Sequence, residues 1–253
     1  MTTTSPIALI TGGNRGLGRS TALELARDGV DVLITYRTNA AEAEAVVAEI
    51  TALGRTARAF QLDTSAVASF SAWIEELHGV LGKTGHERLN LLVNNAGTGL
   101  HAAFADTTEE QFDDMVDVHL KGVFFLTQRL LPLLADGASI VNISSGLARF
   151  SLPGSSAYAM VKGGVEVLTR YLAVELADRG ITVNTLAPGA IATDFAGGMV
   201  RDTPQVRDAV AGMTALGRVG EADDVGTAIA GLFASRSRWI TGQRIEASGG
   251  MSL

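Results

Sequence analysis

The sequence predicts one α/β domain built on a doubly wound parallel sheet of about seven strands, with helices on both faces. Short β-branched segments alternate with longer amphipathic ones along all 253 residues, and such alternation forms parallel sheets with right-handed crossovers. Residues 91–93 and 140–141 are apolar throughout, as expected of strands covered on both faces. No charge block or proline-rich linker divides the chain, so we expect a single domain over residues 1–253.

The expected strands and helices follow one another in a regular order. The strands are residues 7–11, 30–36, 57–62, 89–94, 139–143, 182–187 and 244–247. The helices are residues 17–27, 40–53, 67–77, 109–134, 158–179 and 223–233. Gly29, Gly54 and Gly180 follow three of these helices, at positions where glycine commonly ends a helix. In a doubly wound sheet, ligands bind beyond the carboxyl ends of the strands.

Composition excludes several classes of protein. Hydrophobic residues make up 47% of the chain and charged residues only 19%, which excludes a disordered chain. The net charge of −7 repels a phosphate backbone, so we expect no nucleic-acid partner. The absence of cysteine excludes disulfides and thiolate chemistry, and the four histidines are not at metal-ligand spacing, so we expect no metal. No segment has the length of a membrane span or the pattern of a signal peptide, which predicts a cytoplasmic protein without a membrane partner.

A glycine-rich loop follows the first expected strand. Residues 11–18 read TGGNRGLG, and a helical pattern begins at once. Such a loop lets the backbone approach a pyrophosphate, which the free N–H groups of the helix N-terminus then bind. The spacing is not the G-x-G-x-x-G of the commonest dinucleotide fingerprint, and no Lys-Ser/Thr follows, so a triphosphate loop is excluded. The alternative is an ordinary glycine-rich turn. The candidate cofactor residues here are Gly12, Asn14, Arg15, Gly16, Leu17 and Gly18.

The end of the second strand indicates which dinucleotide binds. An NAD site usually has an acidic residue here to hold the ribose 2′-hydroxyl, whereas this chain has Tyr36, Arg37 and Thr38. A guanidinium suits a 2′-phosphate, and Arg15 could bind the same phosphate. We therefore expect NADP(H) rather than NAD(H), the alternative being that each arginine is a solvated surface charge. Asp63, after the third strand, could accept from the adenine amino group or cap the next helix.

Tyr158 and Lys162 carry the candidate chemistry. They are four residues apart in an expected helix and so share one face. A cation beside a buried phenol favours phenolate and lowers its pKa, which would make Tyr158 a proton donor or acceptor near neutral pH. Ser145 lies at the carboxyl end of the fifth strand, where its hydroxyl could bind a substrate oxygen. The alternative is a simple pair on a surface helix.

These motifs, in this order, resemble the short-chain dehydrogenase/reductase family, in its branch of about this length. The resemblance covers nearly the whole chain and implies a Rossmann-type fold. Its elements are residues 11–18, the Asn-Asn-Ala-Gly at 94–97, Ser145, Tyr158 with Lys162, and the Pro-Gly-Ala-Ile-Ala-Thr at 188–193.

The resemblance implies a role for each matching residue. Tyr158 is the general acid in reduction and the base in oxidation, Lys162 lowers the Tyr158 pKa and binds the nicotinamide ribose, and Ser145 holds the substrate carbonyl or hydroxyl. Ile191 and Thr193 meet the nicotinamide carboxamide. The other residues implied to line the cofactor site are Asp63 and Thr64 at the adenine, and Asn95, Ala96, Gly97, Pro188 and Gly189.

His119 departs from the family, whose members usually have asparagine at this position. That asparagine is thought to anchor a water that leads protons toward the lysine. Imidazole can donate and accept, and it titrates near physiological pH. His119 therefore either replaces the relay with a different pH dependence or is a core histidine that weakens it.

The leading hypothesis is an oxidoreductase that transfers a hydride between NADP(H) and a carbonyl or secondary alcohol. The first alternatives are a 3-oxoacyl thioester reductase and a sugar dehydrogenase of the same family. Another class is a non-catalytic NADP(H)-binding sensor or scaffold, which His119 suggests and the presence of Ser145, Tyr158 and Lys162 opposes.

The substrate would be a small molecule selected by residues 146–156 and by a lid at residues 194–213. Phe150, Leu152, Phe195 and Met199 suggest a partly apolar pocket, or else simple packing. Because the family is usually tetrameric or dimeric, the resemblance implies a homo-oligomer, with helices 109–134 and 158–179 at its interfaces.

Overall fold

A computed structural model describes residues 5–234 and 239–253. Seven parallel strands form one sheet in the order β3-β2-β1-β4-β5-β6-β7, which confirms the predicted fold class. The strands are β1 (Ile7–Ile10), β2 (Asp31–Tyr36), β3 (Ala57–Gln61), β4 (Leu89–Asn94), β5 (Leu134–Ile143), β6 (Thr182–Pro188) and β7 (Arg244–Ala247).

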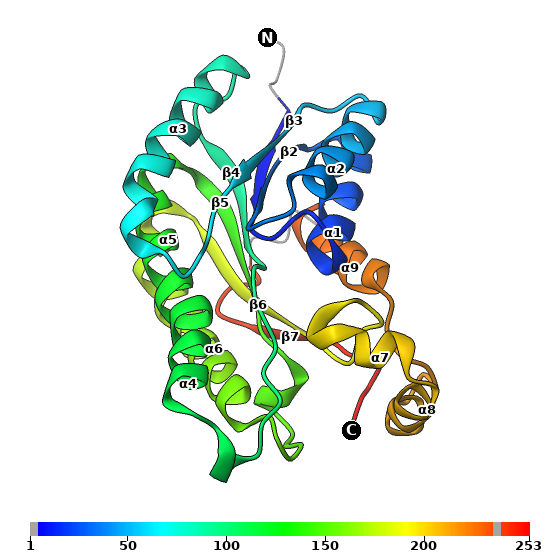
Figure 1. Cartoon of the computed structure of the whole chain (residues 1–253). Helices are drawn as coiled ribbons and strands as arrows, with labels where there is room; N and C mark the ends of the chain where they lie inside the picture. The colour runs from blue at the N-terminus through cyan, green and yellow to red at the C-terminus, as the bar shows by residue number, and fades with distance from the viewer. Residues whose placement is uncertain (1–4, 235–238) are drawn as a thin grey trace.

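Helices cover both faces of the sheet (Figure 1). On one face lie α1 (Gly16–Arg27), α2 (Ala40–Ala52) and α9 (Ala222–Ala234). On the other lie α3 (Phe70–Lys83), α4 (Glu109–Val116), α5 (Gly122–Leu130) and α6 (Ser156–Glu175). The short helices α7 (Met199–Asp202) and α8 (Pro204–Met213) lie beyond the carboxyl ends of the strands, within the segment expected to be a lid.

Alternate residues of the central strands fill two separate cores. Leu9 and Leu92 pack in the core beneath α3 and α5, whereas Ile10 and Val93 pack in the core beneath α1, α2 and α9. All four side chains are fully buried. Burying each stabilises the fold by about 1.5–3 kcal/mol, which explains why the central strands are apolar on both faces.

The expected helix at residues 109–134 is wrong as one continuous helix. The structure has α4, then a π-helical turn at Asp117–Lys121, then α5 and a 3-10 turn at Leu131–Leu133. Proline at the start of that last turn has no N–H to continue the helical hydrogen bonding. As a result β5 begins at Leu134, before the expected residue 139.

Other boundaries differ at helix ends. The helix expected at 67–77 begins as a 3-10 turn, and α3 then extends to Lys83. The helix expected at 158–179 begins at Ser156 and ends at Glu175, before a 3-10 turn that Gly180 closes in the left-handed region, at φ 64°.

The order of the strands places the ligand crevice. β1 pairs with β2 on one side and with β4 on the other, so the chain changes direction across the sheet between β1 and β4. In open α/β sheets the crevice outside the carboxyl ends of such strands binds ligands. Thr11 and Asn95 meet there, since the Asn95 N–H donates to Thr11 Oγ1 at 2.9 Å.

The carboxylate of Asp31 is buried at the amino-terminal end of β2, at the end of the sheet opposite the crevice. Asp31 Oδ1 accepts from the Thr56 N–H at 2.8 Å and from Arg55 Nη2 at 2.7 Å, and Oδ2 lies 3.0 Å from His86 Nε2. Burial by itself raises the pKa of Asp31, but the bonds from Thr56, Arg55 and His86, with the Arg55 charge, outweigh it and hold the pKa below its ordinary value of 3.8.

Replacing this carboxylate will make stability less dependent on pH. Because the pKa of Asp31 is lower in the folded state than its ordinary value of 3.8, the ionised carboxylate contributes its full stabilisation of the fold above pH 3.8. This contribution is lost as the pH falls through the pKa of the folded state. We expect Asp31→Asn to cost about 1–3 kcal/mol at neutral pH, and expect the difference from wild type to shrink in acid. Urea unfolding at several pH values measures it, with exposed Asp28→Asn as the control. Equal losses at neutral and acid pH would contradict the assignment.

Candidate active site

One cavity of about 710 Å³ lies at the carboxyl ends of the strands and collects the predicted site residues. The loops after β1, β2, β4, β5 and β6 all contribute to its lining. Every residue predicted for catalysis or cofactor binding lines it except Gly18, which is buried behind the loop.

The glycine-rich loop needs glycine at several positions, of which Gly12 and Gly18 are two. Gly12 has φ +65°, in the left-handed region. A Cβ on Gly18 would lie 2.3 Å from the carbonyl oxygen of Gly12, so Gly18 allows α1 to approach the loop. Arg15, the N-cap residue, makes no side-chain capping bond to α1. The N-terminus of α1 therefore remains available to the phosphates of a dinucleotide.

Asn95 fixes this loop against the end of β4. Its side-chain amide donates to the carbonyl oxygens of Thr11 and Gly12, at 2.8 and 3.1 Å. Thr11 Oγ1 accepts from the N–H groups of Asn95 and Ala96, both at 2.9 Å. These bonds join the two strands at the crevice and leave the backbone of Ala96 and Gly97 as part of the cavity lining.

The two arginines expected at the 2′-phosphate differ in their surroundings. Arg37 is exposed, and within residues 5–234 and 239–253 no hydrogen bond or ion pair engages its guanidinium, which lines the cavity with Tyr36 and Thr38. Arg15 forms an ion pair with Asp194, at the start of the segment predicted to be a lid. The structure thus leaves the Arg37 guanidinium without a partner among the described residues and pairs Arg15 with Asp194.

The Asp63 side chain forms a local turn with Ser65. Its Oδ1 accepts from the Ser65 N–H at 2.9 Å and from the Ser65 hydroxyl at 2.7 Å. Asp63 and Thr64 still line the cavity. This contact is not the helix cap considered for Asp63, because the next 3-10 turn begins after Ala66 and α3 begins after Ser69; the contact with adenine stays a prediction.

Ser145, Tyr158 and Lys162 meet in the cavity. Ser145 follows β5 in extended backbone, and its hydroxyl oxygen accepts from the Leu147 N–H at 3.2 Å. Tyr158 lies in the first turn of α6 and Lys162 one turn later, with Lys162 Nζ 5.6 Å from the centre of the phenol ring. The buried Nζ donates to the carbonyl oxygen of Ile143 at 2.8 Å.

Burial controls the charges of this group. It raises the pKa of Tyr158 far above its usual value, and the interaction with the Ser145 hydroxyl opposes this only in part. Burial also lowers the pKa of Lys162 to about 7. The Tyr158 pKa is therefore not lowered toward neutral pH in the protein alone, because desolvation disfavours phenolate; a lowering effect of Lys162 stays a prediction.

His119 lies in the π-helical turn, with its ring edge-on to Tyr158 and the ring centres 5.5 Å apart. Its Nε2 lies 2.8 Å from the carbonyl oxygen of Thr98, so this nitrogen carries the proton and donates. Nδ1 is buried and has no hydrogen-bond partner in the described part of the chain. Burial, with the Lys162 charge, lowers the His119 pKa to about 3. The expected titration near physiological pH is wrong, because the buried ring stays neutral.

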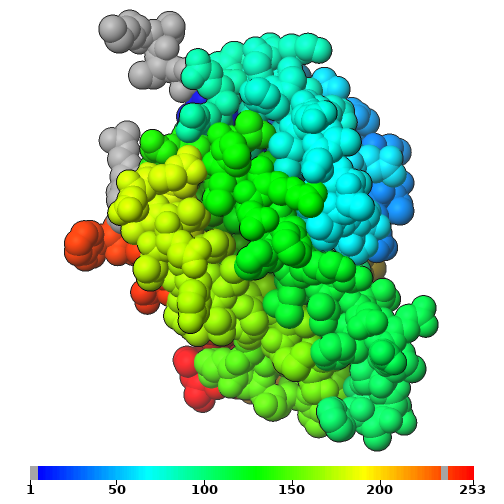
Figure 2. All heavy atoms as spheres, turned by 90° about the vertical axis from the view of Figure 1, so that its left-hand side faces the viewer, coloured from blue at the N-terminus to red at the C-terminus, as the bar shows by residue number. Residues whose placement is uncertain are grey.

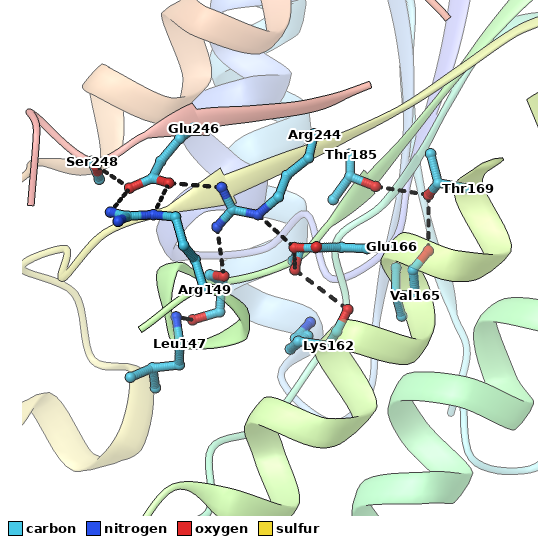
Figure 3. Close-up of polar contacts among 12 residues, drawn as sticks. Leu147, Arg149, Lys162, Val165, Glu166, Thr169, Thr185, Arg244, Glu246 and Ser248 are labelled. Carbon is cyan, nitrogen blue, oxygen red and sulfur yellow. Dashed lines mark hydrogen bonds and ion pairs between the residues drawn. The ribbon is translucent and has the colours of Figure 1, made fainter. Parts of the chain in front are cut away.

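Behind Ser145 lies a network of charged side chains that sequence reasoning missed (Figure 3). Arg244 of β7 donates to Glu166 Oε1 at 2.8 Å, to Glu246 Oε2 at 2.7 Å and to the Ser145 carbonyl oxygen at 3.3 Å. The Ser144 hydroxyl donates to Glu166 Oε1 at 2.7 Å. The network therefore holds the backbone at the end of β5 from the side away from the cavity.

The network extends to the C-terminal segment through Arg149, which donates to both oxygens of Glu246 at 2.8 Å and to the Met251 carbonyl oxygen at 2.6 Å. Of the residues in this network, only Glu166 could have been placed near the site from the sequence, because it lies four residues after Lys162 on the same face of α6. Arg149, Arg244 and Glu246 are brought to it by the fold.

Two expected absences concern membranes and metals. Within residues 5–234 and 239–253, no helix is long and apolar enough to span a membrane. Over the same ranges, no three potential ligands among His, Cys, Asp and Glu form a group that could hold a metal ion.

Comparisons with known proteins agree with this geometry. A family profile described as Enoyl-(Acyl carrier protein) reductase matches residues 12–252. The 3-oxoacyl-[acyl-carrier-protein] reductase FabG of Staphylococcus aureus is 37% identical over 248 residues, which are 97% of this chain and 98% of the relative.

Solved structures show the same similarity. The promiscuous reductase LugOII, which catalyses keto-reduction at C1 during lugdunomycin biosynthesis, has a TM-score of 0.91 and 41% identity, covering 98% of this chain and 97% of its own. The angucycline C-6 ketoreductase LanV with bound NADP has a TM-score of 0.91 and 35% identity, covering 98% and 95%. Matched over nearly its whole length in sequence and in structure, the chain belongs to the short-chain dehydrogenase/reductase family and is an oxidoreductase acting on C=O and CH–OH groups.

Proposed function

We propose that the protein is an NADP(H)-dependent ketoreductase whose reacting groups are Ser145, Tyr158 and Lys162. The observation that carries the proposal is the meeting of these three side chains in the cavity that also contains the glycine-rich loop. A nicotinamide cofactor, when bound, supplies or accepts the hydride. The relatives LugOII and LanV, described as a reductase and a ketoreductase, support the same reaction.

Tyr158 supplies the proton in the reducing direction. Its raised pKa keeps the hydroxyl protonated at neutral pH, which is the state a proton donor needs. The Ser145 hydroxyl binds the substrate oxygen and stabilises negative charge as it develops there. Lys162, anchored by the Ile143 carbonyl at 2.8 Å, lies beside the phenol and would bind the nicotinamide ribose.

His119 fits the proton relay better than a core histidine. A core histidine normally has both ring nitrogens paired, whereas the His119 Nδ1 is buried without a partner among the described residues. As the unprotonated nitrogen, Nδ1 can accept a hydrogen bond from a water molecule. The relay would then use a neutral imidazole.

The glycine-rich loop, Arg37 and the free N-terminus of α1 support NADP(H). Arg37 is the cavity cation with no partner among the described residues, so it can bind a 2′-phosphate. Arg15 could join it only by leaving Asp194. The other cofactor contacts, from Asn95 to Thr193, stay predictions.

A second candidate function is reduction of 3-oxoacyl thioesters. The matching profile and the FabG relative, at 37% identity, favour it. A sugar dehydrogenase has no comparable support, and a non-catalytic sensor is opposed by the intact set of Ser145, Tyr158 and Lys162. A cytoplasmic location stays a prediction.

We also infer a homo-oligomer, a tetramer or a dimer, that uses the surface of α6. Met160, Val167, Tyr171 and Val174 are 54%, 45%, 65% and 77% exposed, and their spacing places them along one side of the helix. α5 and α6 lie on the face shown in Figure 2. A stripe of this kind on a water-exposed helix is typical of a protein interface.

Tyr158→Phe removes the proton donor and keeps the ring. We expect turnover of an activated ketone with NADPH to fall roughly 10²–10⁴-fold, while NADPH affinity, measured by fluorescence titration, stays close to that of wild type. Tyr171→Phe, outside the cavity lining on the exposed side of the same helix, is the control, with its oligomeric state compared with that of wild type because Tyr171 lies in the inferred interface. Retained turnover in Tyr158→Phe would refute the assignment.

Arg37→Asp replaces the free cation with an anion. We expect NADPH affinity to fall by about tenfold or more through loss of a charge-assisted bond and added repulsion, with little change for NADH. Titration of both cofactors measures this, and Arg88→Asp, exposed and outside the cavity lining, is the control. Equal losses for NADPH and NADH would show that Arg37 does not contact the 2′-phosphate.

Arg244→Lys tests whether the charged network positions Ser145. A lysine keeps the charge but cannot reach Glu166, Glu246 and the Ser145 carbonyl together. We expect kcat to fall by up to about 10²-fold, because a small displacement of a reacting group is costly, with NADPH affinity unchanged. A fall in thermal stability with kcat intact would mean that the network is only structural.

A further inference from the structure

Aromatic rings wall the cavity beyond Tyr158, and each lies against a glycine. A Cβ on Gly99 would come 2.9 Å from the Phe195 ring, one on Gly146 would come 2.8 Å from the Phe150 ring, and one on Gly154 would come 2.4 Å from the His101 ring. All three rings line the cavity. Because each ring lies directly on backbone, we call Phe195, Phe150 and His101 the ring wall.

The ring wall reaches the ring of Tyr158. The Phe195 and Tyr158 rings have centres 6.0 Å apart and planes tilted by 54°, within the range of favourable aromatic pairs. Phe195 belongs to the segment after β6 and Phe150 to the loop after β5, so different parts of the chain supply the wall. A flat ligand could contact these rings with its carbonyl near Tyr158.

Where the cavity opens to solvent near the ring wall, its lining is apolar. Leu152, Phe195 and Met199 are 41%, 43% and 46% exposed although they line the cavity. Apolar side chains left exposed in a concave site indicate a ligand that will cover them. The other apolar residues that line the cavity around them include Leu100, Val206, Val210 and Met251.

Among the described residues, no lysine or arginine lines the cavity at the ring wall, although Arg149, which is paired with Glu246, lies over the Phe150 ring at 5.4 Å. In the described ranges, the lysines and arginines that line the cavity are Arg15, Arg37 and Lys162. Arg15 pairs with Asp194, Arg37 follows β2, and Lys162 is buried at the Ile143 carbonyl. None is placed to bind the phosphates of a coenzyme A or phosphopantetheine thioester, and the net charge of −7 repels an acidic carrier protein.

We propose that the substrate is an uncharged ketone on a fused, largely planar ring system that includes an aromatic ring. The ring wall and the apolar mouth cover its faces, while Ser145 and Tyr158 bind its one reacting oxygen. In reduction the carbonyl carbon accepts the hydride and the oxygen accepts the Tyr158 proton, so the ketone becomes a secondary alcohol and NADPH becomes NADP⁺. Tyr158 then regains a proton from solvent. This assignment rests on the ketoreductase function proposed above.

The test compares three ketones with the full-length protein and NADPH. β-Tetralone is the fused-ring ketone, ethyl acetoacetate a small uncharged aliphatic ketone, and acetoacetyl-CoA a charged 3-oxoacyl thioester. We expect kcat/KM for β-tetralone to exceed both others by about tenfold or more, equivalent to ~1.4 kcal/mol. NADPH oxidation gives the rates.

Phe195→Ala then tests the ring wall. We expect kcat/KM for β-tetralone to fall by about threefold to tenfold through the lost ring contact, and kcat/KM for ethyl acetoacetate to change less than about twofold. Phe104→Ala is the matched control, since Phe104 is 85% exposed and outside the cavity lining. Circular dichroism confirms that both variants fold.

The outcomes separate the two proposals. Preference for acetoacetyl-CoA, or equal losses for both uncharged ketones in Phe195→Ala, would overturn the fused-ring assignment and leave the ketoreductase function in place. Binding of NADPH without turnover of any of the three ketones would overturn both.

Discussion

Burial of Lys162 is the constraint on which the site depends. Its side chain is 4% exposed, and its Nζ donates to the Ile143 carbonyl at the end of β5. No carboxylate pairs with it in the described part of the chain, so its positive charge is poorly compensated and its pKa falls to about 7. The same dry surroundings keep Tyr158 protonated and His119 neutral. Of these three groups only Lys162 titrates near neutral pH, so the centre of the site holds no permanent charge.

Such a site needs a rigid frame, because desolvated polar groups act only where their geometry is fixed. The sheet supplies one side of the frame, through β5 and its carbonyl groups. The other side is supplied by the network of Arg244, Glu166 and Glu246 (Figure 3). This network binds the Ser145 carbonyl and the Ser144 hydroxyl and does not line the cavity. The most strongly charged cluster near the site therefore faces away from the substrate and leaves the substrate side uncharged.

Glycines shape both ends of the cavity, for different reasons. At the cofactor end, Gly18 lets a helix N-terminus approach the loop that would hold phosphates. At the substrate end, Gly99 and Gly146 let aromatic rings lie on the backbone. One end is polar and rich in N–H groups, the other flat and apolar. This asymmetry separates recognition of a dinucleotide from recognition of a ring system.

The sequence by itself determined the fold class, the order of the strands and helices, and the motifs that reach the cavity. Those signals are local: apolar strands, glycine positions, and the four-residue spacing of Tyr158 and Lys162. The tertiary structure alone decided the protonation states, the partner of Arg15, the split of the helix at residues 109–134, and the network behind Ser145. These depend on burial and on contacts between residues far apart in the chain, such as Arg244 with Glu166. No local sequence pattern determines how far burial removes a side chain from solvent, or which charged residue from a distant part of the chain lies beside it.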